Sequence, residues 1–207
     1  SSPLIFDPTD LELLDSCYYL GYGFGGMKVG LFQSQDNCDL SEVLSIAYGE
    51  INKFGEDSFV GEIRNELKIM TKSNEMMTDS NYVSISPLHN GYALAMKETG
   101  VGYLNSQAEE VIDFQYEPYM GIMSSGLFYE GYAIVKSDGL FGIIDTAGNY
   151  KISAQYKQLI RLEDLYGSRQ GDHWSILSLT KDSITPALFA SIDALGDGFV
   201  LYKENGK

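Results

Sequence analysis

A glycine-rich segment near the start of the chain has the spacing of a nucleotide-binding loop. Gly21, Gly23 and Gly26 form a GxGxxG pattern. In a dinucleotide site such a loop opens a helix whose N-terminal amides bind the pyrophosphate. Here the loop leads into the apolar segment Met27–Phe32, which is typical of a strand, and the residues of a kinase catalytic loop do not follow. The pattern therefore favours a hairpin turn over a nucleotide site.

The two histidines stand outside any catalytic or metal-binding pattern. His89 lies in the loop-like segment Pro87–Asn90, and His173 precedes Trp174 on an expected strand. Neither has a serine or cysteine in a nucleophile context, and no HExxH pair supplies metal ligands. We expect both histidines at the surface.

Two adjacent acidic pairs, Glu109–Glu110 and Glu163–Asp164, could be considered for glycoside hydrolysis. Catalytic carboxylates must face one another across a cleft, which adjacency in sequence does not provide. We expect the first pair in a solvated loop. Asp193 and Asp197 lack the ligand spacing of an EF-hand calcium loop. The sequence thus predicts no catalytic residue, no metal and no cofactor.

The charge of the chain argues against two classes of partner. Its formal charge of −15 comes from 14 basic and 29 acidic residues. Nucleic-acid binding requires clustered lysine and arginine, and anionic lipid head groups would be repelled. We therefore expect no nucleic-acid partner and no membrane insertion; no run of 18 apolar residues exists either. We interpret the net negative charge as a feature that keeps the protein soluble.

The cellular compartment stays open. Cys17 and Cys38 could form a disulfide, but we expect them not to be bridged. The chain opens with Ser1-Ser2-Pro3 and not with Met, so a targeting segment could have been removed. A bacterial cell envelope or secreted location is slightly favoured over the cytoplasm.

The elements that would position any site are short strands in a repeated order. Three segments, beginning at Gly91, Gly131 and Gly198, have the order Gly, aromatic, apolar run, Lys and, after two residues, Gly. This order predicts a strand, a tight turn and a second strand. We expect antiparallel strands at residues 132–136 and 140–145, and a matching hairpin around Gly100.

A fixed inner spacing supports the repeat. An aromatic residue follows the central position of each unit by fourteen residues. The four pairs are Lys68 with Tyr82, Gly102 with Tyr116, Gly142 with Tyr156, and Ser175 with Phe189. Because the aromatic residues recur in register, we expect them at equivalent, largely buried positions.

Residues 91–159 resemble the WG-repeat family of bacterial proteins. The family unit has an apolar strand, an aromatic residue followed by Gly, an apolar pair, Asp, a turn, and a strand that ends near Tyr. Gly139–Asp145 is the nearest match, with Phe141 where the family usually has Trp. Val101 replaces the Trp before Gly102, and Ser175 replaces the Gly of another copy. The resemblance implies a repeat array and no general activity.

The sequence predicts an all-β fold of tandem β-hairpin repeats, stacked into a curved solenoid-like or superhelical array; a propeller-like or partly open barrel is the alternative. We expect one domain over residues 1–207. Its parts are an atypical cap or first repeat (1–58), repeats at 59–90, 91–130, 131–163 and 164–197, and the start of a truncated repeat at 198–207. In the last part we expect an edge strand at residues 199–203 and fraying from Glu204 to Lys207.

Short helices are expected only in the N-terminal part. Apolar residues recur every three or four positions over residues 40–54, which is helical periodicity. Asp39 or Ser41 could cap its start and Gly55 could end it. A second short helix is expected at Thr9–Ser16.

Several tyrosines fall outside the repeat register. They could form an exposed aromatic surface for a peptide or glycan. These residues are Tyr18, Tyr19, Tyr22, Tyr119 and Tyr129.

The sequence favours a non-enzymatic repeat scaffold that mediates protein–protein interaction through a protein or peptide partner. It does not indicate the binding residues or the oligomeric state, although the C-terminal edge strand could associate. The alternatives are a carbohydrate- or peptide-binding envelope protein, and a hydrolase with a cleft beside the N-terminal segment.

Overall fold

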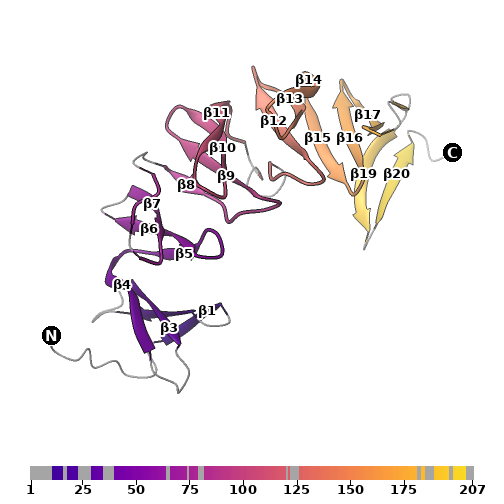
Figure 1. Ribbon diagram of the computed structural model, residues 1–207. Helices are drawn as coiled ribbons and strands as arrows, with labels where there is room; N and C mark the ends of the chain where they lie inside the picture. The colour runs from indigo at the N-terminus through magenta and orange to yellow at the C-terminus, as the bar shows by residue number, and fades with distance from the viewer. Residues whose placement is uncertain are drawn as a thin grey trace. The chain divides into compact units, whose positions relative to one another are not determined.

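The computed structural model has twenty strands, β1 to β20, and no helix within its described residues (Figure 1). The chain divides into two compact units, residues 1–99 with 103–111, and residues 100–102 with 112–207. The structure describes residues 11–15, 18–22, 29–34, 40–63, 66–73, 75–78, 82–119, 121, 126–180, 183–184, 189–195 and 198–203.

The first unit contains two sheets in which consecutive strands are neighbours. Their strand orders are β1-β2-β3-β4 and β5-β6-β7, and the pairs are antiparallel. The strands are β1 (Leu11–Asp15), β2 (Tyr18–Tyr22), β3 (Val29–Ser34), β4 (Leu40–Tyr48), β5 (Ile51–Lys53), β6 (Ser58–Ile63) and β7 (Glu66–Thr71).

The GxGxxG segment connects two antiparallel strands. Gly21 lies in β2 opposite Gly30 of β3, and Tyr22 pairs with Val29. A hairpin connection, as the sequence favoured, therefore replaces the strand-to-helix turn of a dinucleotide site. Residues 23–28 lie outside the described part.

The helix predicted over residues 40–54 is wrong, because this segment forms β4 and β5. β4 pairs with β3 with two shifts of register, one on each side of the pair formed by Leu31 and Leu44. Such bulges add residues to β4, so its apolar residues no longer alternate and acquire helix-like spacing. The helix predicted at Thr9–Ser16 is also wrong, since Leu11–Asp15 pairs with β2 as β1.

A third sheet contains the hairpin predicted around Gly100. Its strand order is β11-β10-β9-β8. β9 and β10 are adjacent and separated by two residues, which is possible only for an antiparallel pair. The strands are β8 (Ser84–Ile85), β9 (Tyr92–Lys97), β10 (Gly100–Asn105) and β11 (Glu110–Tyr116).

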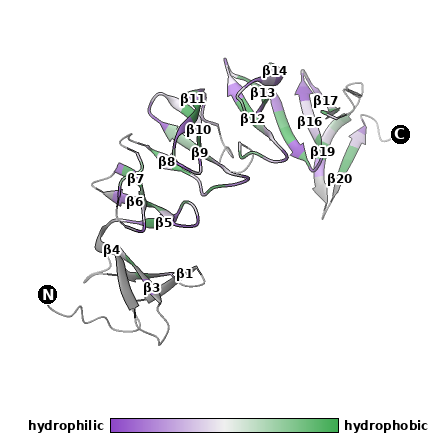
Figure 2. Cartoon of the chain, viewed as in Figure 1, coloured by the Kyte–Doolittle hydropathy of each residue, from purple (hydrophilic) through white to green (hydrophobic). Residues whose placement is uncertain are grey.

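The second unit contains a three-stranded sheet, β12-β13-β14, and a six-stranded sheet of order β15-β16-β17-β19-β20, in which β18 also pairs with β17. Apolar residues concentrate along the strands and hydrophilic residues at their ends (Figure 2). The strands are β12 (Tyr132–Ser137), β13 (Leu140–Asp145), β14 (Tyr150–Tyr156), β15 (Gln158–Leu162), β16 (Leu165–Gln170), β17 (His173–Ser178), β18 (Ser183–Ile184), β19 (Phe189–Leu195) and β20 (Gly198–Lys203).

The best-defined hairpin prediction is confirmed. β12 and β13 are antiparallel, and their pairing runs from Tyr132 opposite Asp145 to Ser137 opposite Leu140. Asp138 and Gly139 have φ of 50° and 75°. Two positive φ angles in a two-residue loop define the type I′ turn that matches strand twist.

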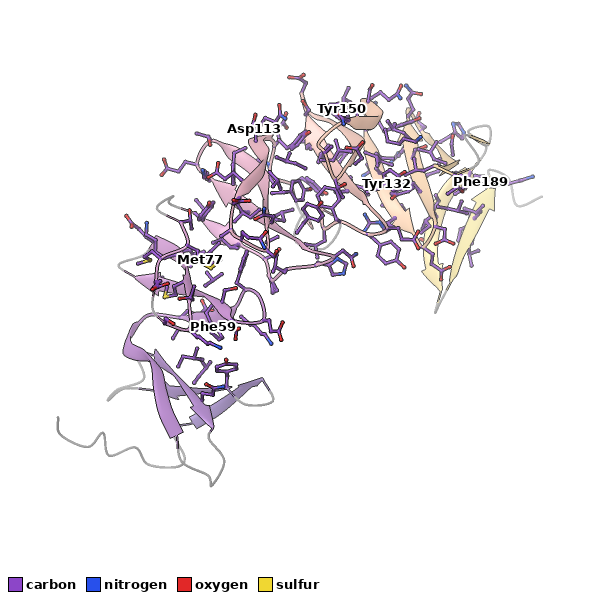
Figure 3. All side chains as sticks on the ribbon, viewed as in Figure 1. Phe59, Met77, Asp113, Tyr132, Tyr150 and Phe189 are labelled. Carbon is purple, nitrogen blue, oxygen red and sulfur yellow. The ribbon has the colours of Figure 1, made fainter. Side chains whose placement is uncertain are left out.

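The aromatic register has a structural counterpart. Tyr156 pairs with Phe141, Phe189 pairs with Trp174, and Tyr82 forms a bridge with Leu67. Each aromatic residue thus lies opposite the residue that precedes a central position. Tyr82, Tyr116 and Tyr156 are buried, as predicted, whereas Phe189, labelled in Figure 3, is half-buried.

The predicted C-terminal edge strand is also confirmed. β20 is the last strand of its sheet and pairs with β19 from Phe189 opposite Lys203 to Leu195 opposite Gly198. Glu204–Lys207, and the two cysteines, Cys17 and Cys38, lie outside the described residues, so the predictions for them stand as predictions.

Candidate functional site

The first unit contains a groove of about 1500 Å³, which we call the acidic groove. β5, β6 and β7 form its floor, where Asn52 lies opposite Val60 and Glu62 opposite Leu67. Directly paired and alternate residues share a face of a sheet, so these four side chains lie together. The segment around β8, with Val83 and Ile85, and the end of β9 form its wall.

Negative charge predominates along the acidic groove. Its lining includes the five carboxylates Glu50, Glu56, Glu62, Glu66 and Glu98, against Lys53 and Lys97. Lys97 forms an ion pair with Glu110. The same carboxylate accepts a hydrogen bond of 3.3 Å from the Tyr82 hydroxyl, and the Lys97 ammonium lies 5.3 Å from the centre of the Tyr82 ring. These contacts fix the repeat tyrosine at the groove wall.

The second unit contains a groove of about 860 Å³, which we call the aromatic groove. Aromatic, aliphatic and polar side chains from five segments line it. They are Tyr119, Tyr129, Phe141, Gln158, Leu159, Ile160, Arg161, Glu163, Trp174 and Ile192. Tyr129 is 40% exposed, while Phe141 and Trp174 are half-buried, so their rings are accessible.

Tyr119 is held against the core of the second unit. Its hydroxyl donates a hydrogen bond of 3.0 Å to the carbonyl of Ile134, and its ring meets that of Phe141 edge-on at 5.0 Å. Both rings pack on the buried cluster around Ile143 and Leu159. Tyr119 therefore presents a fixed ring surface to the groove.

Arg161 fixes the segment that carries Tyr129. Its guanidinium donates hydrogen bonds to the carbonyls of Leu127, at 3.3 Å, and Tyr132, at 3.0 Å. It also lies 5.3 Å from the centre of the Tyr129 ring and 5.9 Å from that of Tyr166. Burial raises the pKa of the Tyr166 hydroxyl, although the positive charge of Arg161 acts in the opposite direction.

The two grooves occupy equivalent positions of the repeat. Leu67 in one and Phe141 in the other precede a central position. Ile85 and Leu159 each follow the repeat tyrosine by three residues. Trp174, in the next copy, also precedes a central position. The two grooves therefore share these two positions of the predicted repeat, and the aromatic groove also includes residues of neighbouring copies.

The residues first considered for chemistry lie on separate loops and strands. His89 is exposed in a loop, and His173 begins β17. Asn105 donates to the carboxylate of Glu109, in the turn before β11, and so holds a loop together. Glu163–Asp164 forms the turn between β15 and β16. Among the described residues, no group of three His, Cys, Asp or Glu side chains could hold a metal ion; Asp197 is not among them.

Of the described tyrosines outside the register, one is buried and two line the aromatic groove. Tyr18 is buried, and its ring meets that of Phe59 edge-on at 5.3 Å. Tyr119 and Tyr129 share the aromatic groove. The side chains of Tyr19 and Tyr22 lie outside the described part.

Sequence reasoning missed Phe141, Trp174 and Arg161 as groove residues. The first two carried a usable signal, because both occupy the repeated aromatic position and such a position can face a groove as well as a core. Arg161 follows no repeated pattern.

One family matches part of the chain: residues 102–141 match the WG containing repeat family. The resemblance to this family is therefore confirmed for that segment. No curated protein matches the chain.

The chain is also similar to several solved structures. For Kluyveromyces lactis Hsv2 the identity is 10%, with 84% of this chain and 60% of that chain covered and a TM-score of 0.41. For the N-terminal domain of Nup159 the identity is 9%, with 94% of this chain and 60% of that chain covered and a TM-score of 0.43. For the WD40 domain of SCAP from fission yeast the identity is 9%, with 96% of this chain and 63% of that chain covered and a TM-score of 0.35. The chain spans less than two thirds of each of these proteins.

The described residues include no helix with the length and hydrophobicity of a membrane span.

Proposed function

We propose that this chain is a non-enzymatic repeat scaffold that binds extended segments of a protein partner in grooves that recur along the array. The observation that carries the proposal is the equivalence of the two grooves, each of which contains the residue before a central position. Repeat arrays gain ligand surface by repeating one unit, and substitutions at equivalent positions then change the ligand without changing the fold.

The repeats at 59–90, 91–130, 131–163 and 164–197 would be the units of this scaffold, with residues 1–58 as an atypical first repeat. Successive hairpins would stack into a curved, solenoid-like array. The pairings of Tyr82, Tyr156 and Phe189 support a common register for three of these units. Stacking of neighbours would bury the remaining apolar faces.

A carbohydrate-binding function is the second candidate. It is supported by the exposed ring of Tyr129 beside Trp174, because aromatic faces also bind sugar rings. Binding assays with both ligand classes distinguish the two functions.

The test is selection of peptides from a displayed random library against the chain. We expect enriched peptides that lose binding when Glu62→Lys reverses a charge in the acidic groove or Tyr129→Ala removes a ring from the aromatic groove. The matched control is Tyr150→Ala, because Tyr150 is 43% exposed and does not line either groove. Enriched peptides that bind the groove variants and the control variant equally, or no enrichment at all, would contradict the proposal.

A further inference from the structure

We infer that the aromatic groove binds a proline-rich segment in the polyproline II conformation, with a basic residue of that segment beside Glu163. This inference rests on the proposed function and specifies the ligand of one groove.

The lining of the aromatic groove suits a polyproline II segment. Four aromatic residues line it, together with three aliphatic residues: Tyr119, Tyr129, Phe141, Trp174, Leu159, Ile160 and Ile192. Polyproline II segments have no internal hydrogen bonds and present pyrrolidine rings on three sides. Grooves lined by several aromatic rings recognise such segments because ring packs on ring at little conformational cost.

The groove is already formed without a ligand. The Tyr119 hydroxyl is fixed by Ile134, and Arg161 joins the carbonyls of Leu127 and Tyr132 on either side of Tyr129. Binding therefore requires little ordering of the protein, and a polyproline II ligand is itself ordered in advance.

The groove also offers a suitable hydrogen-bond donor. A polyproline II segment leaves its carbonyl oxygens unpaired, and the indole N–H of Trp174 can only donate. This N–H donates no hydrogen bond to another residue that the structure describes. Trp174 can therefore bind a ligand carbonyl while its ring packs on a proline.

The charge of Glu163 indicates which residue lies beside the proline-rich segment of the ligand. Arg161 directs its Nη2 to two backbone carbonyls of the protein itself, and its Nε is buried without a hydrogen-bond partner among the described residues. Glu163 is exposed at the rim and forms no ion pair with any residue that the structure describes. A lysine or arginine next to the proline-rich segment would complement this carboxylate, and the charge of −15 would increase the rate of association.

The chain offers a direct reporter, because Trp174 is its only tryptophan. The experiment uses the full chain and follows Trp174 emission during titration with three probes. These are a short polyproline peptide that ends in arginine, its analogue that ends in glutamine, and a neutral glucose oligosaccharide. We expect a saturable change with both peptides, about threefold tighter binding of the arginine peptide, and no change with the oligosaccharide.

Three variants locate the site. Tyr129→Ala should weaken binding of the arginine peptide about tenfold, and Tyr150→Ala should leave it unchanged. Glu163→Gln should abolish the difference between the two peptides while it leaves the affinity of the glutamine peptide unaltered. Circular dichroism melting of each variant confirms that it is folded.

Three results would overturn the inference: saturation by the oligosaccharide alone, no response to any probe, or peptide binding that Tyr129→Ala leaves unchanged. The peptide selection described above separates these failures from failure of the proposed function. Enriched peptides without proline would reject this inference and retain the scaffold.

Discussion

The central glycine of the repeat is required by close approach of a neighbouring strand. A Cβ atom at Gly142 would lie 2.7 Å from the Ile152 carbonyl oxygen and 2.8 Å from the Ala154 amide nitrogen. At Gly102 it would lie 2.6 Å from the Ile112 carbonyl oxygen. These are backbone atoms, which cannot move aside as a flexible side chain can. The pairing of β13 with β14 is irregular at this point, and such a bulge bends the strand and increases its twist.

Gly142→Ala and Gly139→Ala separate two reasons for glycine. At Gly139, with φ of 75°, an added Cβ meets nothing within 4 Å, so only the left-handed conformation opposes it. We expect Gly139→Ala to lower the free energy of unfolding by about 1 kcal/mol and Gly142→Ala by about 3 kcal/mol, because the strands must separate. Urea unfolding of both variants measures this. A larger effect at Gly139 would reject the argument from close approach.

The repeat tyrosines stabilise the core through burial. Tyr156 is 7% exposed and belongs to the cluster with Ile134 and Leu177, whereas Tyr150, on the same strand, is 43% exposed. Tyr156→Ala should therefore lower the free energy of unfolding by about 3–5 kcal/mol, and Tyr150→Ala by less than about 1 kcal/mol. Thermal melting of the two variants tests the difference. Similar melting temperatures would show that the aromatic residue fourteen positions after the central position does not belong to the core.

At the scale of elements, the sequence predicted the hairpins because their determinants are local. Asp138–Gly139 encodes one turn, and the apolar runs beside it encode its strands. β4 depends instead on its pairing with β3, whose bulges change the spacing of the apolar residues. Periodicity alone could not distinguish this strand from a helix. The grooves depend on contacts between strands of different hairpins, so the repeated aromatic position indicated Phe141 and Trp174, whereas no local pattern indicated Arg161.

Glu117 stabilises the β12–β13 turn from outside the hairpin. Its carboxylate accepts a hydrogen bond of 2.9 Å from the Gly139 amide and forms an ion pair of 3.0 Å with Lys136. The Gly139 hydrogen bond, followed by the contact with Lys136, lowers the pKa of this carboxyl below its ordinary value of 4.5. Since the pKa is lowered on folding, the contribution to stability is present above pH 4.5 and is lost as the pH falls through the lowered value.

Glu117→Gln tests this contribution. We expect the variant to melt at a lower temperature than the wild type at neutral pH, and the difference to vanish in acid. Glu117→Asp keeps the charge but shortens the side chain by one methylene, so it distinguishes the effect of the charge from that of side-chain length. Melting temperatures of the wild type and both variants, measured from neutral to acid pH, show whether the contribution depends on the charge of this carboxylate. A difference that is independent of pH would mean that the carboxylate charge is not responsible.

At the scale of the whole molecule, the final hairpin determines how the six-stranded sheet ends. β19 pairs with β17 only at Phe189 opposite Trp174, whereas it pairs with β20 along its whole length. β19 therefore depends on β20 for most of its hydrogen bonds. β20 has no second neighbour among the described strands, and Tyr202 at this edge is 48% exposed. Such an edge is open to association with another strand.

Deletion of residues 198–207 tests both properties of this edge. Without β20, β19 would retain a single paired position and should detach, because a lone strand is not stable. We expect the melting temperature to fall by about 5 °C or more. The matched control lacks only residues 204–207 and should melt like the full chain. Light scattering of all three proteins reports association: a full chain larger than a monomer, with a monomeric deletion variant, would place the contact at β20. Equal melting temperatures and equal sizes would show that residues 198–207 contribute neither pairing nor association, and that the repeat does not extend into this segment.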